Sequence, residues 1–455
     1  MRVLMFGWEF PPLASGGLGT ACYGLARGLR THGVKLTFVM PKVPEGVISD
    51  RAELVSAAAA ISAKVPREGV VADEVIKINS LITPYLSYDE YLERKAKYGS
   101  LVDEFSLQEG SSNKSNDIYG KDLYSEVWRY RQRARLVALT RDFDVIHCHD
   151  WLTYGAGIEA KKATGKPLVM HIHATEFDRT GDNPNQYVYN LEKEGFEHAD
   201  KILAVSNFTK NRVVTHYGID PSKIEVVHNA VEWDESEFDH PREQLSPEDK
   251  VVLFLGRITV QKGPDWFLYA AKMVAEHYPN VKFIVSGSGD MESFMISKAA
   301  ELGLGDKVLF TGFLRGKDID RAYRMADLYV MPSISEPFGI TPLEAMRNGT
   351  PVLISKQSGV SEVIKNCLRT DFWDVHDMAN KMLAALQYPA LHTQLQETGK
   401  SEVKTFSWDE PARKCVNAYH TVLQKHRERQ NQLGTHGHLE GNLHGHGFHN
   451  QRGGI

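Results

Sequence analysis

The sequence is poor in cysteine, and the few cysteines it has are scattered. Its 455 residues contain no CxxC motif, and the four cysteines are Cys22, Cys148, Cys367 and Cys415. A small secreted domain held by disulfides would need more of them at closer spacing. The chain therefore fits a reducing compartment, and we expect a cytoplasmic protein.

A basic excess and a long apolar run are also missing. Lys and Arg number 53 against 58 Asp and Glu, a net charge of −5, so we do not expect nucleic acid as a partner. The apolar start, VLMFGWEF, is short and meets Pro11 and Pro12, which excludes a signal peptide or stable membrane insertion there. With 42% hydrophobic and 24% charged residues, the chain has the composition of a soluble globular protein, and its length of 455 residues indicates two domains.

Short apolar runs alternate with helical patterns along most of the chain. This alternation predicts an α/β fold with two parallel sheets wound by helices. The polar segment 233–250 has no apolar period and is the expected linker, so we predict domains at 1–240 and 241–407. The predicted strands are 35–40, 145–148, 168–172, 202–205, 224–227, 251–255, 282–286, 308–311, 328–331 and 351–354.

The segment SEPFGITPLEAMRNGTP, residues 335–351, contains two carboxylates eight positions apart, Glu336 and Glu344. Proline is poorly tolerated inside a helix, so Pro337 and Pro342 place the two acids on different elements. With Thr341 as N-cap and Pro342 in the first helical position, the sequence predicts a helix start here.

A helix start of this kind suits a nucleotide-sugar. The backbone amides of Gly339, Ile340 and Thr341 can face a diphosphate, while Glu336 lies near the hydroxyls of a sugar and Glu344 accepts from a ribose hydroxyl. The alternative is a capping box, in which Glu344 only folds back onto Thr341.

The run VVLFLGRITVQKGPDWFLYAA predicts a buried strand, then a loop with Arg257 and Lys262, then a helix starting near Pro264. Both cations follow the carboxyl end of the strand, where open α/β sheets bind ligands, and they suit a diphosphate. Surface charges without a role are the alternative.

Six motifs in order resemble those of the retaining glycosyltransferases of the two-domain GT-B class, most of all bacterial and archaeal glycogen or starch synthases. The motifs are FGWEFPPLASGGLGT, DVIHCHDW, HIHATEFDR, HNAVE, GRITVQKG and SEPFGITPLEAM. The resemblance covers the chain to about residue 425. It implies two Rossmann-like domains facing a cleft, with a helix at about 408–427 that crosses back to the first domain.

The resemblance also implies site roles. By this likeness Arg257 and Lys262 hold the donor diphosphate, Glu336 meets the donor glucose and Glu344 meets the ribose. His173 lies beside the reacting sugar. Two further residues are selected in the same way: Asp150 in the active site and Asn229 near the cleft.

The implied reaction moves glucose from a nucleotide-sugar to the nonreducing end of an α-1,4-glucan with retention of configuration. No carboxylate stands out as a covalent nucleophile, so the leaving diphosphate oxygen assists the incoming hydroxyl and Arg257 and Lys262 stabilise its charge. No metal and no cofactor are expected.

The glycine loop after the first strand, with Gly16 and Gly17, allows close approach to a phosphate. The ADP-glucose-dependent bacterial enzymes commonly have a lysine two residues before the glycine pair, and this chain has Ala14 there. UDP-glucose and ADP-glucose therefore both remain as donors.

Four histidines, His147, His149, His171 and His173, fall at two predicted strand ends and raise the question of zinc. Each pair faces one side of its strand, but only Asp150 accompanies them as a further ligand type. The sequence therefore favours satisfied core histidines at positions 147 and 171 over a metal site.

Other functions stay open at this point. They are a retaining transferase for another glycan (a surface polysaccharide or a small glucoside), a noncatalytic glycan-binding scaffold, and a sugar-nucleotide epimerase. Tyrosines in 83–125 either stack on an acceptor sugar or pack a helical insert, and the spacer 108–117 is predicted to be a surface loop. The His-rich tail, 428–455, is predicted to be disordered and without a catalytic role. The sequence predicts no oligomeric state.

Overall fold

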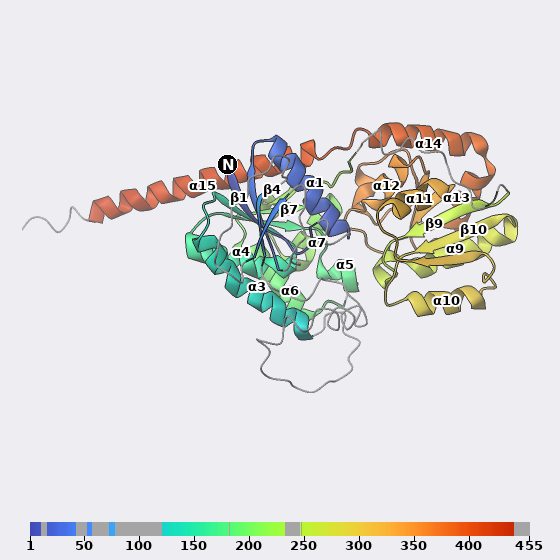
Figure 1. Cartoon of the computed structure of the whole chain (residues 1–455), viewed down its shortest axis with the longest axis horizontal. Helices are drawn as coiled ribbons and strands as arrows, with labels where there is room; N and C mark the ends of the chain where they lie inside the picture. Colours follow the sequence, from blue (N-terminus) through green and yellow to red (C-terminus); the bar gives the residue numbers. More distant parts are fainter. Residues whose placement is uncertain are drawn as a thin grey trace, which may run out of the picture.

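The protein consists of two halves, each built on a parallel sheet with helices on both faces (Figure 1). The computed structural model describes residues 1–10, 16–41, 52–56, 72–77, 121–181, 183–232, 246 and 248–440. Several predictions lie outside these residues: Ala14 of the glycine loop, the spacer 108–117 and most of the linker 233–250.

The sheet of the first half has eight strands in the order β3-β4-β2-β1-β5-β6-β7-β8. Every neighbouring pair is parallel, as the alternation of strands and helices predicts. The strands are β1 (Arg2–Phe6), β2 (Lys35–Met40), β3 (Ala52–Ser56), β4 (Ala72–Lys77), β5 (Val145–His149), β6 (Leu168–Ile172), β7 (Lys201–Ala204) and β8 (Ile224–Val226).

Helices cover both faces of this sheet. On one face lies α1, and on the other α3 and α4 pack together with α6 against α4 (Figure 1). The helices are α1 (Gly17–Thr31), α3 (Lys121–Leu139), α4 (Trp151–Thr164), α5 (Glu176–Thr180), α6 (Gln186–His198), α7 (Asn207–Tyr217) and the 3-10 turn η2 (Pro221–Lys223).

The second half has a six-stranded sheet in the order β11-β10-β9-β12-β13-β14, again with parallel pairs throughout. Its strands are β9 (Lys250–Leu255), β10 (Val281–Ser286), β11 (Val308–Gly312), β12 (Leu328–Met331), β13 (Val352–Ser355) and β14 (Leu368–Thr370). Its helices are η3 (Val260–Lys262), α9 (Pro264–His277), α10 (Glu292–Glu301), α11 (Lys317–Met325), α12 (Thr341–Arg347), η4 (Gly359–Glu362), α13 (Val375–Gln387) and α14 (Pro389–Val403).

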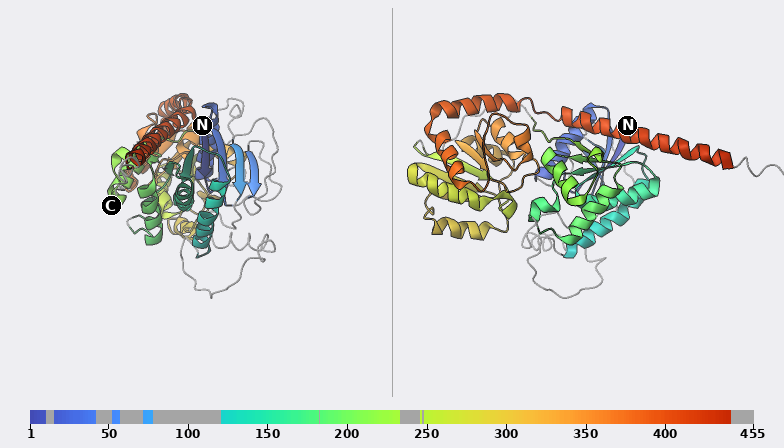
Figure 2. Two further views of the ribbon diagram at one scale, coloured as in Figure 1. Left: turned by 90° about the vertical axis from the view of Figure 1, so that its left-hand side faces the viewer. Right: turned by 180° about the vertical axis from the view of Figure 1, so that it is seen from behind.

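The last helix, α15 (Asp409–Glu440), returns from the second half and packs along α1 on the first half (Figures 1 and 2). Glycines of α1 permit this contact, since a Cβ on Gly24 would lie 2.1 Å from the ring of Trp408. The helix runs past residue 428, where the sequence predicts a disordered tail. The prediction is wrong for 428–440, because α15 continues there; Glu428, Arg429 and Gln430, all good helix formers, carry the helix past the predicted boundary. Residues 441–455 lie outside the described residues.

None of the described helices is both long and apolar enough to span a bilayer.

Candidate active site

The candidate site residues follow strands at the points where each sheet reverses its winding. In the first half β1 lies between β2 and β5, and in the second half β9 lies between β10 and β12. Loops that leave neighbouring strands in opposite directions open a ligand site at the carboxyl edge. Asp150 follows β5 and Arg257 follows β9, so each lies at the switch point of its own sheet.

Asp150 has a strained backbone. Its φ of 58° makes it the one residue other than glycine with a positive φ among the described residues. Such a conformation costs about 1–3 kcal/mol and clusters at functional sites. In this conformation the carboxylate of Asp150 faces the loop after β6, where its Oδ1 accepts a hydrogen bond from the backbone amide of His173 at 2.7 Å.

His173 is half-buried next to this carboxylate, and its position beside the reacting sugar stays a prediction. Its Nε2 lies 2.9 Å from Nδ1 of His149, which orients the ring. Burial lowers the pKa of His173, and the charge of Asp150 opposes that shift. The imidazole is therefore neutral at neutral pH and can exchange a hydrogen bond with a sugar hydroxyl.

A buried ionic network, which the sequence reasoning missed, fixes the loop after His173. Arg179 donates to Glu192 Oε1 at 3.0 Å and to the carbonyl of Ala174 at 2.7 Å. Arg179 also lies 3.9 Å from Asp150, so it joins the loop to the strained residue. The motif HATEFDR contains the arginine, but nothing in its pattern identifies Glu192 as the partner.

Glu9 is a second residue that the sequence reasoning missed. It follows β1, is only 6% exposed, and its Oε2 has no hydrogen-bond partner among the described residues. Burial raises the pKa of Glu9 to about 7, although a hydrogen bond from the backbone of Gly19 and the charge of Arg257 in the other half lower it. The electrostatic coupling to Arg257 places Glu9 at the junction of the halves. A carboxylate directly after an apolar strand, in FGWEFPP, was the available signal.

Gly16 belongs to the same corner. A Cβ at Gly16 would lie 2.8 Å from Oε2 of Glu9, so the glycine leaves room for the carboxylate. Gly17 is the first residue of α1, and Gly16 is the N-cap of this helix. The structure thus connects Gly16 to the site, and donor binding by Gly16 and Gly17 stays a prediction.

Of the two predicted cations of the second half, Lys262 contacts the predicted carboxylate directly. Lys262 Nζ donates to Glu336 Oε2 at 2.5 Å, and Ser333 donates to the same oxygen at 3.1 Å. Arg257 donates to Gln261 Oε1 at 3.1 Å, and Gln261 in turn donates to the carbonyl of Ser335. These hydrogen bonds therefore connect the loop after β9 to the loop after β12.

The turn before α12 differs in detail from the prediction. The helix begins at Thr341 with Ile340 as N-cap, so the prediction of Thr341 as N-cap is wrong by one residue. The Thr341 hydroxyl accepts instead from Tyr329 at 2.8 Å, which explains why it does not cap the helix. Gly339 has a φ of 97°, a conformation that favours glycine.

Glu344 does not form the capping box that was the alternative reading. Its Oε2 accepts from the hydroxyl of Tyr323 at 3.1 Å. Burial raises the pKa of Glu344, while Arg347 and the tyrosine hydroxyl lower it. The ribose contact of Glu344 stays a prediction. Asn229 is buried on the segment after β8, and no hydrogen bond joins it to these residues within the described part of the chain.

Direct contacts hold the two halves together around the site. Ser335 of the second half donates to Asp178 Oδ1 of α5 at 2.6 Å. Ser206, which caps α7, donates to the carbonyl of Pro337 at 2.5 Å. The loop 335–341 thus contacts the first half at two points.

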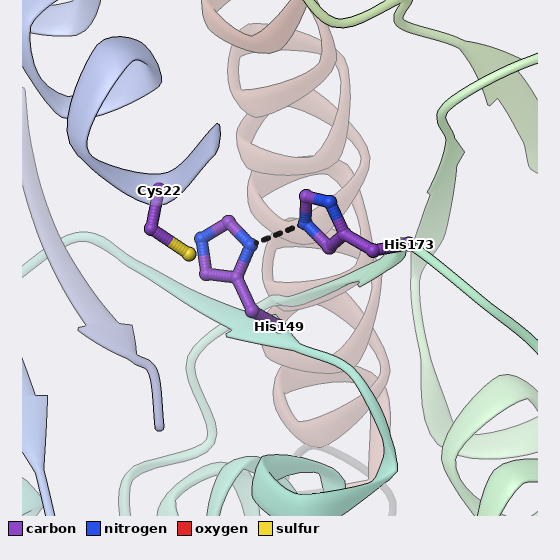
Figure 3. A group of neighbouring side chains, drawn as sticks. All are labelled: Cys22, His149 and His173. Atoms are coloured by element: carbon purple, nitrogen blue, oxygen red, sulfur yellow. Dashed lines mark hydrogen bonds between the residues drawn. The ribbon is translucent and has the colours of Figure 1, made fainter. Parts of the chain in front are cut away.

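The four histidines, which the sequence places in two pairs at two strand ends, pack on one another in a single cluster. Cys22 of α1 lies with His149 and His173, and ligand atoms of the three are within 4.8 Å of one another (Figure 3). The expectation that no cysteine accompanies the histidines is therefore wrong, because α1 packs on this face of the sheet. His171 is also not a satisfied core histidine, since neither ring nitrogen has a hydrogen-bond partner among the described residues.

Two family models match consecutive parts of the chain. Residues 104–235 match "Glycosyltransferase Family 4", and residues 235–402 match "Glycosyl transferases group 1". The chain is a group 1 glycosyltransferase. The second match contains Arg257, Lys262 and the loop of Glu336.

Relatives of this glycosyltransferase agree with that assignment. It is 27% identical to an uncharacterized glycosyltransferase of Methanocaldococcus jannaschii, over 93% of this chain and 99% of that protein. It is 29% identical to a D-inositol 3-phosphate glycosyltransferase of Salinispora tropica, over 67% of this chain and 69% of the relative. A glycogen synthase of Mycobacterium tuberculosis is 24% identical over 95% and 97% of the two chains.

The GT-B fold is shown by solved structures. Sucrose-phosphate synthase from Thermosynechococcus elongatus superposes with a TM-score of 0.67 at 17% identity, covering 93% of this chain and 99% of that one. The predicted two-domain α/β architecture is therefore confirmed.

Proposed function

We propose that this glycosyltransferase moves glucose from UDP-glucose or ADP-glucose to the nonreducing end of an α-1,4-glucan, with the α configuration retained. The observation that carries the proposal is the arrangement at the junction. Arg257, Lys262 and Glu336 lie on one half, and Asp150 and His173 lie on the other, with Glu9 coupled electrostatically to Arg257.

The donor diphosphate is assigned to the second half. Negative charge grows on the diphosphate as the bond to glucose breaks, and two fixed cations stabilise it better than water does. Lys262 is held by Glu336 and Arg257 by Gln261, so neither cation needs to reorganise far during transfer.

The reacting sugar is assigned to the space between Glu336 and His173. The neutral imidazole of His173 exchanges a hydrogen bond with a glucose hydroxyl and Glu336 accepts from others. The acceptor hydroxyl attacks from the face of the leaving group and passes its proton to the diphosphate oxygen, which retains the configuration. No step in this path requires a covalent intermediate on a side chain.

The test is nucleotide release from UDP-glucose and ADP-glucose, each with and without glycogen. We expect glycogen to stimulate release with one donor, and an α-1,4-specific amylase to digest the new product. Release that glycogen does not stimulate with either donor would contradict the glucan acceptor. The variant Arg257→Ala serves as the background control.

A second acceptor class is favoured by the relatives named D-inositol 3-phosphate glycosyltransferase, which are 28–30% identical. A phosphorylated cyclic polyol presents hydroxyls and an anionic group to the first half. The same release assay with inositol phosphate in place of glycogen separates the two, because only one acceptor should raise the rate.

A further inference from the structure

Three histidines form a closed cluster inside the first half. His147 and His149 stand two residues apart on β5, and His149 pairs in register with His171 on β6. Their exposures are 0%, 0% and 1%, so all three rings lie in the core between the sheet and the helices α1 and α15. The site described above uses none of these three rings to contact a substrate.

The ring nitrogens of the cluster divide into two sets. One nitrogen of each β5 histidine is bonded outward: His147 Nδ1 lies 2.6 Å from the hydroxyl of Tyr419, and His149 Nδ1 lies 2.9 Å from His173. The other nitrogens, His147 Nε2, His149 Nε2 and both of His171, have no hydrogen-bond partner among the described residues.

So many unpaired nitrogens in one core are costly. A buried polar group without a partner costs about 1–3 kcal/mol, and native proteins rarely leave several together. The three rings cannot satisfy one another fully, because their centroids lie 4.5, 5.3 and 5.4 Å apart in stacked or tilted pairs. A shared partner at the centre would satisfy one nitrogen of each ring at once.

The geometry suits a metal ion as that partner. One ligand nitrogen from each ring lies within 4.8 Å of the other two. Two imidazoles on one tetrahedral zinc ion have nitrogens about 3.3 Å apart, given a bond of about 2.0–2.1 Å. The rings must therefore turn out of their stacked arrangement to point these nitrogens at one ion.

The outward hydrogen bonds match those of known metal sites. A histidine that binds a metal through one nitrogen usually bonds through the other to a neighbouring group, which fixes its orientation. Tyr419 and His173 occupy those positions for the two β5 histidines. Imidazole ligands favour zinc over calcium or magnesium.

We propose that His147, His149 and His171 bind one zinc ion, which joins β5 to β6 in the core of the first half. Cys22, whose sulfur lies within 4.8 Å of a ring nitrogen of His149, offers a further donor beside the three rings (Figure 3). Because no solvent reaches the three rings, the ion is structural, and it meets the candidate active site through the hydrogen bond between His149 and His173.

The test counts zinc bound to the full-length chain after equilibration with zinc and removal of the excess. The tail must not contribute, so every protein in the comparison has its tail histidines replaced by asparagine; these are His436, His438, His444, His446 and His449. We expect one zinc per chain, and a loss of binding in His147→Asn and His171→Asn.

The matched control is His198→Asn. This histidine is exposed on α6 and bonds to a carbonyl of its own helix, so its replacement should leave one zinc per chain. A chain that binds no stoichiometric zinc, or that still binds it after both His147→Asn and His171→Asn, would overturn the proposal.

A second measurement protects the test against variants that fail to fold. X-ray absorption at the zinc edge of the protein with its core histidines intact should show at least three imidazole ligands. Zinc should also raise the thermal unfolding midpoint, and a chelator should reverse the rise. A spectrum dominated by oxygen ligands, or an unfolding midpoint that zinc does not change, would sink the proposal.

Discussion

At the residue scale, the site combines predicted residues with ones that only the packing reveals. Lys262 and Glu336 could be found from sequence because each occupies a loop after an apolar strand. The strained backbone of Asp150 could not be found in this way, because φ depends on how β5 meets α4. Glu9 was missed for a similar reason: its importance comes from burial against Gly16 and from Arg257 across the junction.

Arg257 gives the first prediction at this scale. Replacement by alanine removes one of two cations assigned to the leaving diphosphate, so we expect the transfer rate to fall by about 10²–10³-fold. The far-ultraviolet circular dichroism spectrum should not change, because the side chain has no part in the core. A rate within a few-fold of the original protein would contradict the assignment.

Glu9 gives a prediction on pH and stability. Its pKa is about 7 in the folded state and about 4.5 in the unfolded state, so the folded protein binds more protons between these values. Stability must then fall as the pH rises from 4.5 to 7, by at most about 3 kcal/mol from this group. Below pH 4.5 Glu9 is protonated in both the folded and the unfolded state, so it does not change the stability there.

Glu9→Gln removes that titration. We therefore expect the free energy of unfolding of the variant, compared with that of the original protein, to rise by up to about 3 kcal/mol as the pH increases from 4.5 to 8. Urea unfolding at each pH measures this difference. Two stability curves that stay parallel across this range would show that Glu9 is not protonated in the folded state near neutral pH.

At the element scale, apolar runs located the central strands well. The predicted runs 35–40, 168–172 and 328–331 coincide with β2, β6 and β12, because a strand covered on both faces must be apolar along its length. Three strands were missed. β3 (AELVS) and β4 (ADEVIK) contain charges, and β14 has three residues, so none forms an apolar run; all three lie at or near sheet edges.

The contact between α1 and α15 gives the prediction at this scale. A Cβ on Gly28 would lie 2.5 Å from the carbonyl oxygen of Trp408 and 2.9 Å from Cβ of Ala412. Gly28→Ala must therefore push the two helices apart, and we expect a loss of about 1–3 kcal/mol in the free energy of unfolding.

Gly17→Ala is the control in the same helix. A Cβ there meets no described atom within 4 Å, so stability should not fall. Equal effects of the two substitutions in a urea titration would mean that helix propensity, not the contact with α15, decides the outcome.

At the scale of the whole molecule, Glu362 of η4 in the second half forms hydrogen bonds with residues of the first half. Its carboxylate accepts from the backbone amides of Asn207 and Phe208, at 2.9 and 2.7 Å, and from His228 Nε2 at 3.1 Å. These contacts lower the pKa of Glu362, since each favours the charged form. One side chain thus supplies partners for the first turn of α7 from the opposite half.

Glu362→Ala should loosen this arrangement. We expect a larger radius of gyration in small-angle X-ray scattering and a several-fold lower transfer rate, because the residues of the site come from both halves. Glu397→Ala, at an exposed position of α14, is the control and should change neither quantity. Scattering that is the same for both variants would show that the other contacts suffice.

The return of α15 to the first half also decides when the protein can finish folding during its synthesis. The apolar face of α1 is covered by Trp408, Ala412 and Tyr419, which a ribosome adds long after the first sheet has emerged. At about 5–20 residues per second, the interval lasts on the order of ten to forty seconds. A nascent chain that stalls in the second half therefore leaves this face open to chaperones and proteases.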